Sequence, residues 1–157
     1  MSLLQLALRR TPSSALRSFA SVMSRKPGVS TDEEMAAFLS TNDASKVVVV
    51  DARNTDFAAE PGDESSAAAG PIAETEAANR PRALNLAYDR ASKSMELSKL
   101  EELLDPELGK ATPIITHCGG GGRGQKAKVF LEAAGYTNVL NGGGPSVPEL
   151  WESFGSL

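Results

Sequence analysis

The amino-acid sequence predicts an α/β fold in which a parallel sheet is covered by helices on both faces. Two runs of large apolar residues, KVVVVDAR at 46–53 and TPIITHC at 112–118, lack polar alternation, which is typical of strands buried on both faces. Segments with helical spacing separate such strands along the chain, as in an α/β fold. Ligands of these folds bind at the carboxyl ends of the strands, so we expect function there.

The first half of the chain predicts one helix, one strand and one long loop. TDEEMAAFLS begins with a capping box, Thr31 and Glu34, followed by apolar residues at helical spacing. Val47 to Val50 then predict the first strand, which ends at Asp51. Residues 58–79 are rich in small and polar residues and contain few large apolar side chains, which predicts a low-complexity surface loop, at most partly helical.

The second half predicts three strands and three helices in alternation. RALNLAYD contains a short strand around 83–86, and MELSKLEELL is a helix that ends before Pro106. TPIITHC is the second buried strand, and GQKAKVFLEAAG is a helix that Gly135 terminates. YTNVLNGGGP gives the last strand with a glycine turn, and VPELWESFG gives a final short helix in which Trp151 is expected to pack on the core.

The charge distribution separates an N-terminal segment from the rest. Residues 1–31 contain five basic residues and no acidic one, which leaves eleven basic residues against twenty acidic ones in the remainder. An acidic domain of this kind is a poor partner for nucleic acid, which requires a basic surface. No apolar run is long enough to cross a bilayer, so we expect no membrane partner.

The N-terminal segment has the composition of an organelle import leader. Its arginines, serines and leucines occur without acidic residues, as in transit peptides. RSFAS at 17–21 resembles a mitochondrial processing site with cleavage after Phe19. We therefore expect a mitochondrial transit peptide or disordered segment over 1–28 and a domain over 29–157. Chloroplast import and a simple disordered basic tail are the alternatives.

The chain's only cysteine and only histidine are adjacent, in ITHCGGGGRGQKAKVF at 114–129. A single cysteine excludes an internal disulfide, a CxxC pair and a thiolate zinc site. Gly119, Gly121 and Gly124 match G-x-G-x-x-G, but no acidic residue follows at the spacing that a ribose contact requires. A Walker loop is excluded because Gln125 stands where it needs lysine.

These residues instead predict a nucleophile in an anion-binding loop. Cys118 lies between a strand and a helix, where the helix dipole favours a thiolate. The glycines permit backbone amides to converge on one point, and Arg123 can turn back to add a positive charge. The predicted catalytic residues are Cys118 and Arg123, and the predicted substrate-binding residues are Gly119, Gly120, Gly121, Gly122 and Gly124. His117 is expected to point away from the loop, because side chains alternate along a strand, and a role as catalytic base is the alternative for it. For Cys118 the alternative is a buried cysteine that only packs in the core.

Four stretches together resemble the single-domain rhodanese family of thiosulfate sulfurtransferases. They are VVVVDAR, RALNLAY, IITHCGGGGRGQKA and GYTNVLNGGGP, and the resemblance covers about 29–154. It implies a three-layer α/β/α domain with a central, mainly parallel five-stranded sheet. It also implies that Asp51 and Arg53 support the active-site loop, and that neither cofactor nor metal is required.

The resemblance further implies a two-step sulfur transfer. Cys118 takes the outer sulfur of a small anionic donor such as thiosulfate, and cyanide or a thiol then removes it from the persulfide. A related phosphatase or arsenate reductase is the enzymatic alternative, but such enzymes place five residues between cysteine and arginine, whereas Gly119 to Gly122 are four. A non-catalytic sulfur-relay or partner-binding module remains a further alternative. The physiological donor and acceptor and the oligomeric state are not specified by the sequence.

Overall fold

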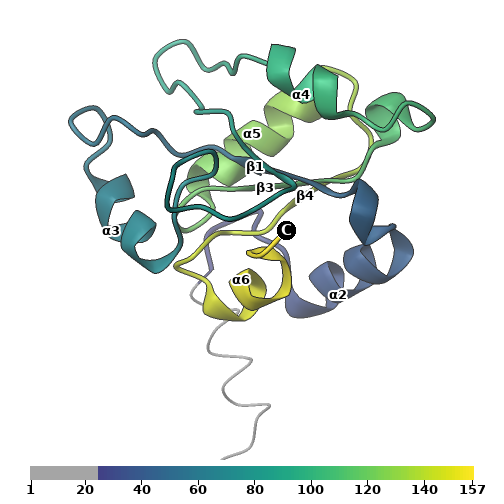
Figure 1. Ribbon diagram of the computed structural model, residues 1–157, viewed down its shortest axis with the longest axis horizontal. Coiled ribbons are helices and arrows are strands. Elements are labelled where there is room, and N and C mark those ends of the chain that lie inside the picture. Colours follow the sequence, from purple (N-terminus) through teal and green to yellow (C-terminus); the bar gives the residue numbers. More distant parts are fainter. Residues whose placement is uncertain (1–24) are drawn as a thin grey trace, which may run out of the picture.

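A four-stranded parallel sheet forms the centre of the protein (Figure 1). The computed structural model describes residues 25–157, so the predicted leader lies almost entirely outside the described residues. The strands are β1 (Val48–Asp51), β2 (Ala83–Asn85), β3 (Ile114–His117) and β4 (Val139–Asn141), in the spatial order β2-β1-β3-β4. All three neighbouring pairs are parallel, as the sequence predicts.

Helices cover both faces of this sheet (Figure 1). On one side lie α2 (Asp32–Thr41) and α6 (Pro148–Phe154), and on the other lie α4 (Ser98–Leu103) and α5 (Gly122–Ala133). The predicted capping box is confirmed, since Thr31 Oγ1 accepts from the Glu34 amide and Glu34 accepts from the Thr31 amide. An α/β fold with a parallel sheet and helices is therefore established.

The core consists of two apolar clusters separated by the sheet. Val48 and Val50 face α4 and α5, where they contact Leu100 and Leu131. Val47, Val49 and Ile115 face the other side, among Met35, Leu150 and Phe154. Successive strand side chains point to opposite faces, which explains why the uninterrupted valine run at 47–50 serves both clusters.

The expected five-stranded sheet is wrong, because the described residues form four strands. The edge beside β4 carries only the beginning of a fifth strand, in which the Ser30 amide donates to the Asn141 carbonyl at 2.9 Å. A turn with Gly28 at φ +84° precedes this contact, and α2 starts two residues after it. Too few extended residues remain between that turn and the helix to form a ladder.

Residues 58–79 combine loop with one short helix, which agrees with a partly helical loop, but several of their side chains are buried. They contain the helix α3 (Gly62–Ala69), in which Asp63 and Ser66 are buried, and the following Ile72 and Ala73 are also buried. The small side chains of this segment permit close packing at the carboxyl end of the sheet, where a Cβ built on Gly119 would lie 3.0 Å from the Ser66 Cβ. The low complexity of the segment therefore accompanies an ordered contact with the rest of the fold.

Two residues before the expected start of the domain at residue 29 contact the domain. Arg25 and Lys26 are described, and the Arg25 guanidinium donates to the Ser30 carbonyl at 3.0 Å and to Asp32 at 2.7 Å. Within 25–157, no helix is both long enough and apolar enough to span a bilayer. The last residues of the four strands, Asp51, Asn85, His117 and Asn141, come together at one edge.

Candidate active site

Cys118 lies in the loop between β3 and α5, where it is buried with only 4% of its surface exposed. Its Sγ accepts a hydrogen bond from the Gly121 amide at 3.1 Å. Gly121 has φ +105°, and a Cβ at this position would lie 2.3 Å from Val29 Cγ2, so the conformation and the space both require glycine. The first amides of α5 follow at once and have no acceptor within the helix, so this end stabilises negative charge near the sulfur.

The predicted glycines occupy different places around the sulfur. Gly119 and Gly120 line a pocket of about 370 Å³ together with Cys118, and Gly122 is the first residue of α5. Gly124 lies behind the loop, where a Cβ would be 2.7 Å from Asn141 Oδ1 and 3.0 Å from the His117 Cα. Gly121 therefore contacts the sulfur, Gly119 and Gly120 border open space, and Gly124 permits α5 to pack against the sheet.

Arg123 lies against the same pocket but is paired with a carboxylate. One guanidinium nitrogen donates to Asp63 Oδ2 at 2.8 Å and the other contacts Oδ1, so the ion pair is bidentate. Burial opposes the charge, but the pairing with Asp63 raises the pKa of Arg123. The expected positive charge is therefore present but is matched by an acidic residue of α3.

Asp51 and Arg53 form a fully buried ion pair at the end of β1. Arg53 donates to both carboxylate oxygens of Asp51, at 3.0 and 2.8 Å. It also donates to the Gly70 carbonyl at 2.8 Å, to the Pro71 carbonyl at 3.2 Å and to Ser66 Oγ at 3.3 Å. The pair thus contacts α3 and the residues just after this helix, and α3 in turn borders Gly119.

His117 lies on the opposite side of the sheet from α5, against α6. Its ring centroid is 5.1 Å from that of Trp151 and 5.7 Å from that of Phe154. Its Nδ1 lies 3.0 Å from the Cys118 carbonyl oxygen, and its Nε2 is 3.4 Å from an Arg80 nitrogen and 3.8 Å from Asp51 Oδ2. Complete burial lowers the pKa of His117 to about 4, against the attraction of Asp51. The ring is neutral at pH 7, so Nδ1 can donate to the carbonyl while Nε2 accepts from Arg80.

Asp51 is the ionised member of this cluster. Burial alone would raise the pKa of the Asp51 carboxyl, but His117, which is charged at the low pH where Asp51 titrates, and the Arg53 guanidinium lower it to about 2. The Ala73 amide also donates to Asp51 Oδ2 at 3.1 Å. The carboxylate is thus fully stabilised without contact with solvent.

The glycine turn after β4 contacts the cysteine loop through its backbone. The Cys118 amide donates to the Gly143 carbonyl at 3.0 Å, and the Ser146 amide donates to the Gly119 carbonyl at 2.9 Å. Asn141 is fully buried and bonds to both loops, donating to the Gly121 carbonyl at 3.0 Å and accepting from the Gly143 amide at 3.0 Å. The geometry of the cysteine loop therefore depends on Asn141 and the turn after it.

The geometry is a buried sulfur at the base of a small polar pocket, with a helix N-terminus beside it. A family model described as a rhodanese-like domain matches residues 32–144 of this chain. The chain belongs to the rhodanese-like family. No curated protein matches it significantly. The family match includes all the predicted site residues and Asp63, but not Arg25 and Lys26 of the rhodanese-like fold described here.

Three contributors to this rhodanese-like site were not identified from the sequence. Asp63 lies in a segment without periodicity. The only sequence signal for it is Arg123, whose charge indicates that a carboxylate lies nearby. Lys26 lines the Cys118 pocket, but the basic composition of the segment around it led to its assignment to the predicted leader. Arg80 stacks over Trp151, with its guanidinium carbon 4.8 Å from the ring centroid, and no sequence pattern indicates this contact. Within 25–157, no cluster of His, Cys, Asp and Glu has the size of a metal site.

The neutral, buried state of His117 predicts a pH dependence of stability. Because its pKa falls from 6.5 to about 4 on folding, between these values the unfolded chain binds a proton that the folded chain does not. Acidification from pH 6.5 to 4 should therefore remove stability from the folded protein, by about 3 kcal/mol from this residue.

The variant His117→Asn tests this prediction, since its amide nitrogen can still donate to the Cys118 carbonyl. Urea unfolding of both proteins at pH 7 and pH 4.5 gives the loss of stability in each. The loss should be smaller in the variant, by about 2 to 3 kcal/mol. Equal losses in the two proteins would show that His117 does not carry this pH dependence.

Proposed function

We propose that the protein is a sulfurtransferase that moves a sulfane sulfur from thiosulfate or a persulfide donor to cyanide or a thiol acceptor. The observation that carries the proposal is the Cys118 Sγ, which borders a pocket of about 370 Å³ and accepts from the Gly121 amide at 3.1 Å. The amide and the N-terminus of α5 favour both the thiolate and the anionic persulfide that replaces it.

The reaction has two balanced steps. The Cys118 thiolate attacks the outer sulfur of thiosulfate; a sulfur–sulfur bond forms to Cys118 while the donor's own bond breaks, and sulfite leaves with the electron pair. Cyanide or a thiolate then attacks the outer sulfur of the persulfide, and the Cys118 thiolate leaves. Neither step needs an oxidant or a metal.

Two features favour sulfur transfer over phosphate or arsenate chemistry. Four residues separate Cys118 from Arg123, so the loop is short for a tetrahedral oxyanion. The Asp63 carboxylate also engages both terminal nitrogens of Arg123. A phosphoryl group on Cys118 would need that guanidinium for its own oxygens. A binding or sulfur-relay module would keep the fold without turnover, and the assays below separate it from an enzyme.

The first prediction of this proposal concerns Cys118. The full chain should transfer sulfur from thiosulfate to cyanide, and the Cys118→Ser variant should lose activity at least about 100-fold, because the hydroxyl cannot form the persulfide. Intact-protein mass spectrometry after thiosulfate treatment should show one added sulfur atom that cyanide removes. Absence of both turnover and added sulfur, with activity on a generic phosphatase substrate, would favour the phosphatase alternative.

A second prediction concerns the ion pair between Arg123 and Asp63. Replacing Arg123 by alanine leaves a buried carboxylate unpaired beside the pocket, so kcat/KM for thiosulfate should fall about 100-fold, whereas Arg123→Lys should lose about tenfold. The double variant Arg123→Ala, Asp63→Asn should recover part of the loss of the alanine variant. Thermal unfolding controls for misfolding. If the double variant is no better than Arg123→Ala, repulsion by Asp63 is not the cause.

We also propose that the basic N-terminal segment directs the protein to mitochondria. The support is its composition and the processing-site pattern at 17–21. Expressed in eukaryotic cells as the full chain, the protein should be recovered from mitochondria with a new N-terminus after Phe19. N-terminal sequencing measures this, and recovery from chloroplasts or with Met1 intact would contradict the proposal.

A further inference from the structure

The pocket around Cys118 contains more positive than negative side chains, but most of its charges are paired. Its cations are Lys26, Arg90 and Arg123, and its carboxylates are Glu60 and Asp63. Arg123 is paired with Asp63, and Arg90 Nε lies 3.1 Å from Glu60. Lys26 has no carboxylate partner among residues 25–157. The unmatched positive charge of the pocket is therefore that of Lys26.

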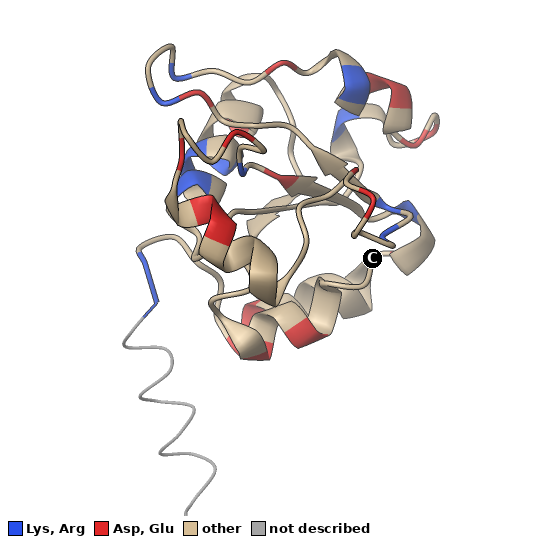
Figure 2. Ribbon diagram, turned by 60° about the vertical axis from the view of Figure 1, so that its left-hand side comes forward, with Lys and Arg blue, Asp and Glu red and all other residues tan. Residues whose placement is uncertain are grey.

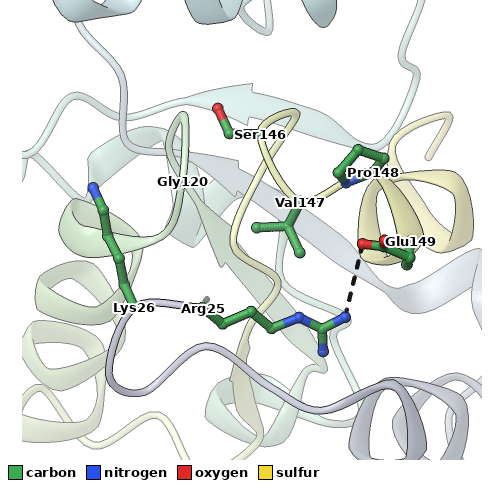
Figure 3. A pocket seen from close by; sticks show the side chains of 7 residues that line it. All are labelled: Arg25, Lys26, Gly120, Ser146, Val147, Pro148 and Glu149. Carbon is green, nitrogen blue, oxygen red and sulfur yellow. Dashed lines mark ion pairs between the residues drawn. The ribbon is translucent and has the colours of Figure 1, made fainter. Parts of the chain in front are cut away.

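The ammonium group of Lys26 lies over the cysteine loop. A Cβ built on Gly120 would be 3.7 Å from Lys26 Nζ, and one built on Gly122 would be 3.6 Å from it. Figure 3 shows the side chain extending towards the Gly120 loop. Because these positions are glycines, no side chain separates the ammonium from the loop. Lys26 borders both the Cys118 pocket and a second pocket that adjoins it beside Ser146 and Val147.

Arg25 fixes the backbone from which Lys26 extends. The Arg25 side chain is only 4% exposed, and it bonds to Asp32 at 2.7 Å and to the Ser30 carbonyl at 3.0 Å. It also lies 3.9 Å from Glu149 of α6 (Figure 3). Arg25 and Lys26 form the blue segment where the chain joins the grey trace in Figure 2. Lys26 therefore belongs to an ordered part of the site, although it precedes the residues 32–144 that match the family model.

We infer that Lys26 binds the sulfonate end of the anionic sulfur donor and determines the preference for doubly charged donors. The inference rests on the proposed sulfur transfer. The outer sulfur of thiosulfate must face Cys118 Sγ, so its sulfonate group points out of the pocket, towards the loop surface that Lys26 covers. The charge of Arg123 is already matched, because Asp63 accepts from both terminal nitrogens of its guanidinium, which leaves only donors such as the Nε, unpartnered within 25–157, for an anion. Lys26 thus lowers the donor's KM, and it also favours bond breaking, because negative charge grows on the sulfonate end as sulfite leaves with the electron pair.

The test compares Lys26→Met with Lys126→Met, a control with the same change of charge. Lys126 is exposed on α5 and does not line the Cys118 pocket. The KM for thiosulfate should rise about tenfold in Lys26→Met and kcat/KM should fall at least as much, whereas Lys126→Met should match the wild type. Lys26→Arg should retain a low KM. The effect should be smaller for methanethiosulfonate, a donor with one charge fewer, and should diminish at high salt.

A binding measurement separates failure of this inference from failure of the proposed function. Isothermal titration of thiosulfate into Cys118→Ser, with and without Lys26→Met, requires no turnover. About tenfold weaker binding in the double variant supports the inference even if the wild type proves inactive. Equal binding or equal KM in the Lys26 and Lys126 variants overturns it, as does the absence of thiosulfate binding to Cys118→Ser.

Discussion

One buried carboxylate, Asp51, organises the carboxyl end of the sheet. It accepts bonds from the Arg53 guanidinium and from the Ala73 amide, and it faces His117 at 3.8 Å. A buried charge is tolerated only where such partners replace water. Each partner in turn contacts another part of the site. Arg53 bonds to Ser66 of α3 and to the Gly70 and Pro71 carbonyls after it, and His117 bonds to the Cys118 carbonyl.

The cysteine loop is therefore held in position by the residues around it rather than by its own side chains. Four successive glycines contribute no side-chain contacts, and their conformational freedom would cost entropy if nothing else fixed them. Asn141 and the turn after β4 supply that restraint through backbone bonds to Cys118, Gly119 and Gly121. The loop can therefore present amides at close range to a small anion while remaining ordered.

The sequence predicted the strands and most helices because each has a strong local pattern. Such patterns indicate burial or backbone conformation directly. Examples are the valine run at 47–50, the capping box at Thr31 and the glycine at 135. The place of the cysteine loop between a strand and a helix was predictable for the same reason, because a buried apolar run precedes it and a helical pattern follows it. The fifth strand came from the resemblance alone, and the short distance between Gly28 and α2 prevents it.

The residues that sequence reasoning missed act through partners distant along the chain. Asp63 is a single acid in a segment of small residues, and its meaning depends on Arg123, sixty positions later. Lys26 lies in a basic stretch without acidic residues, as in a leader. The Arg25 side chain, however, bonds to α2, and this contact places Lys26 over Gly120. A loop built of glycine lacks a charged side chain between cysteine and arginine, and Asp63 already neutralises that arginine. In the proposed sulfur transfer, the cation that binds the donor therefore comes from another segment, and we propose that Lys26 supplies it.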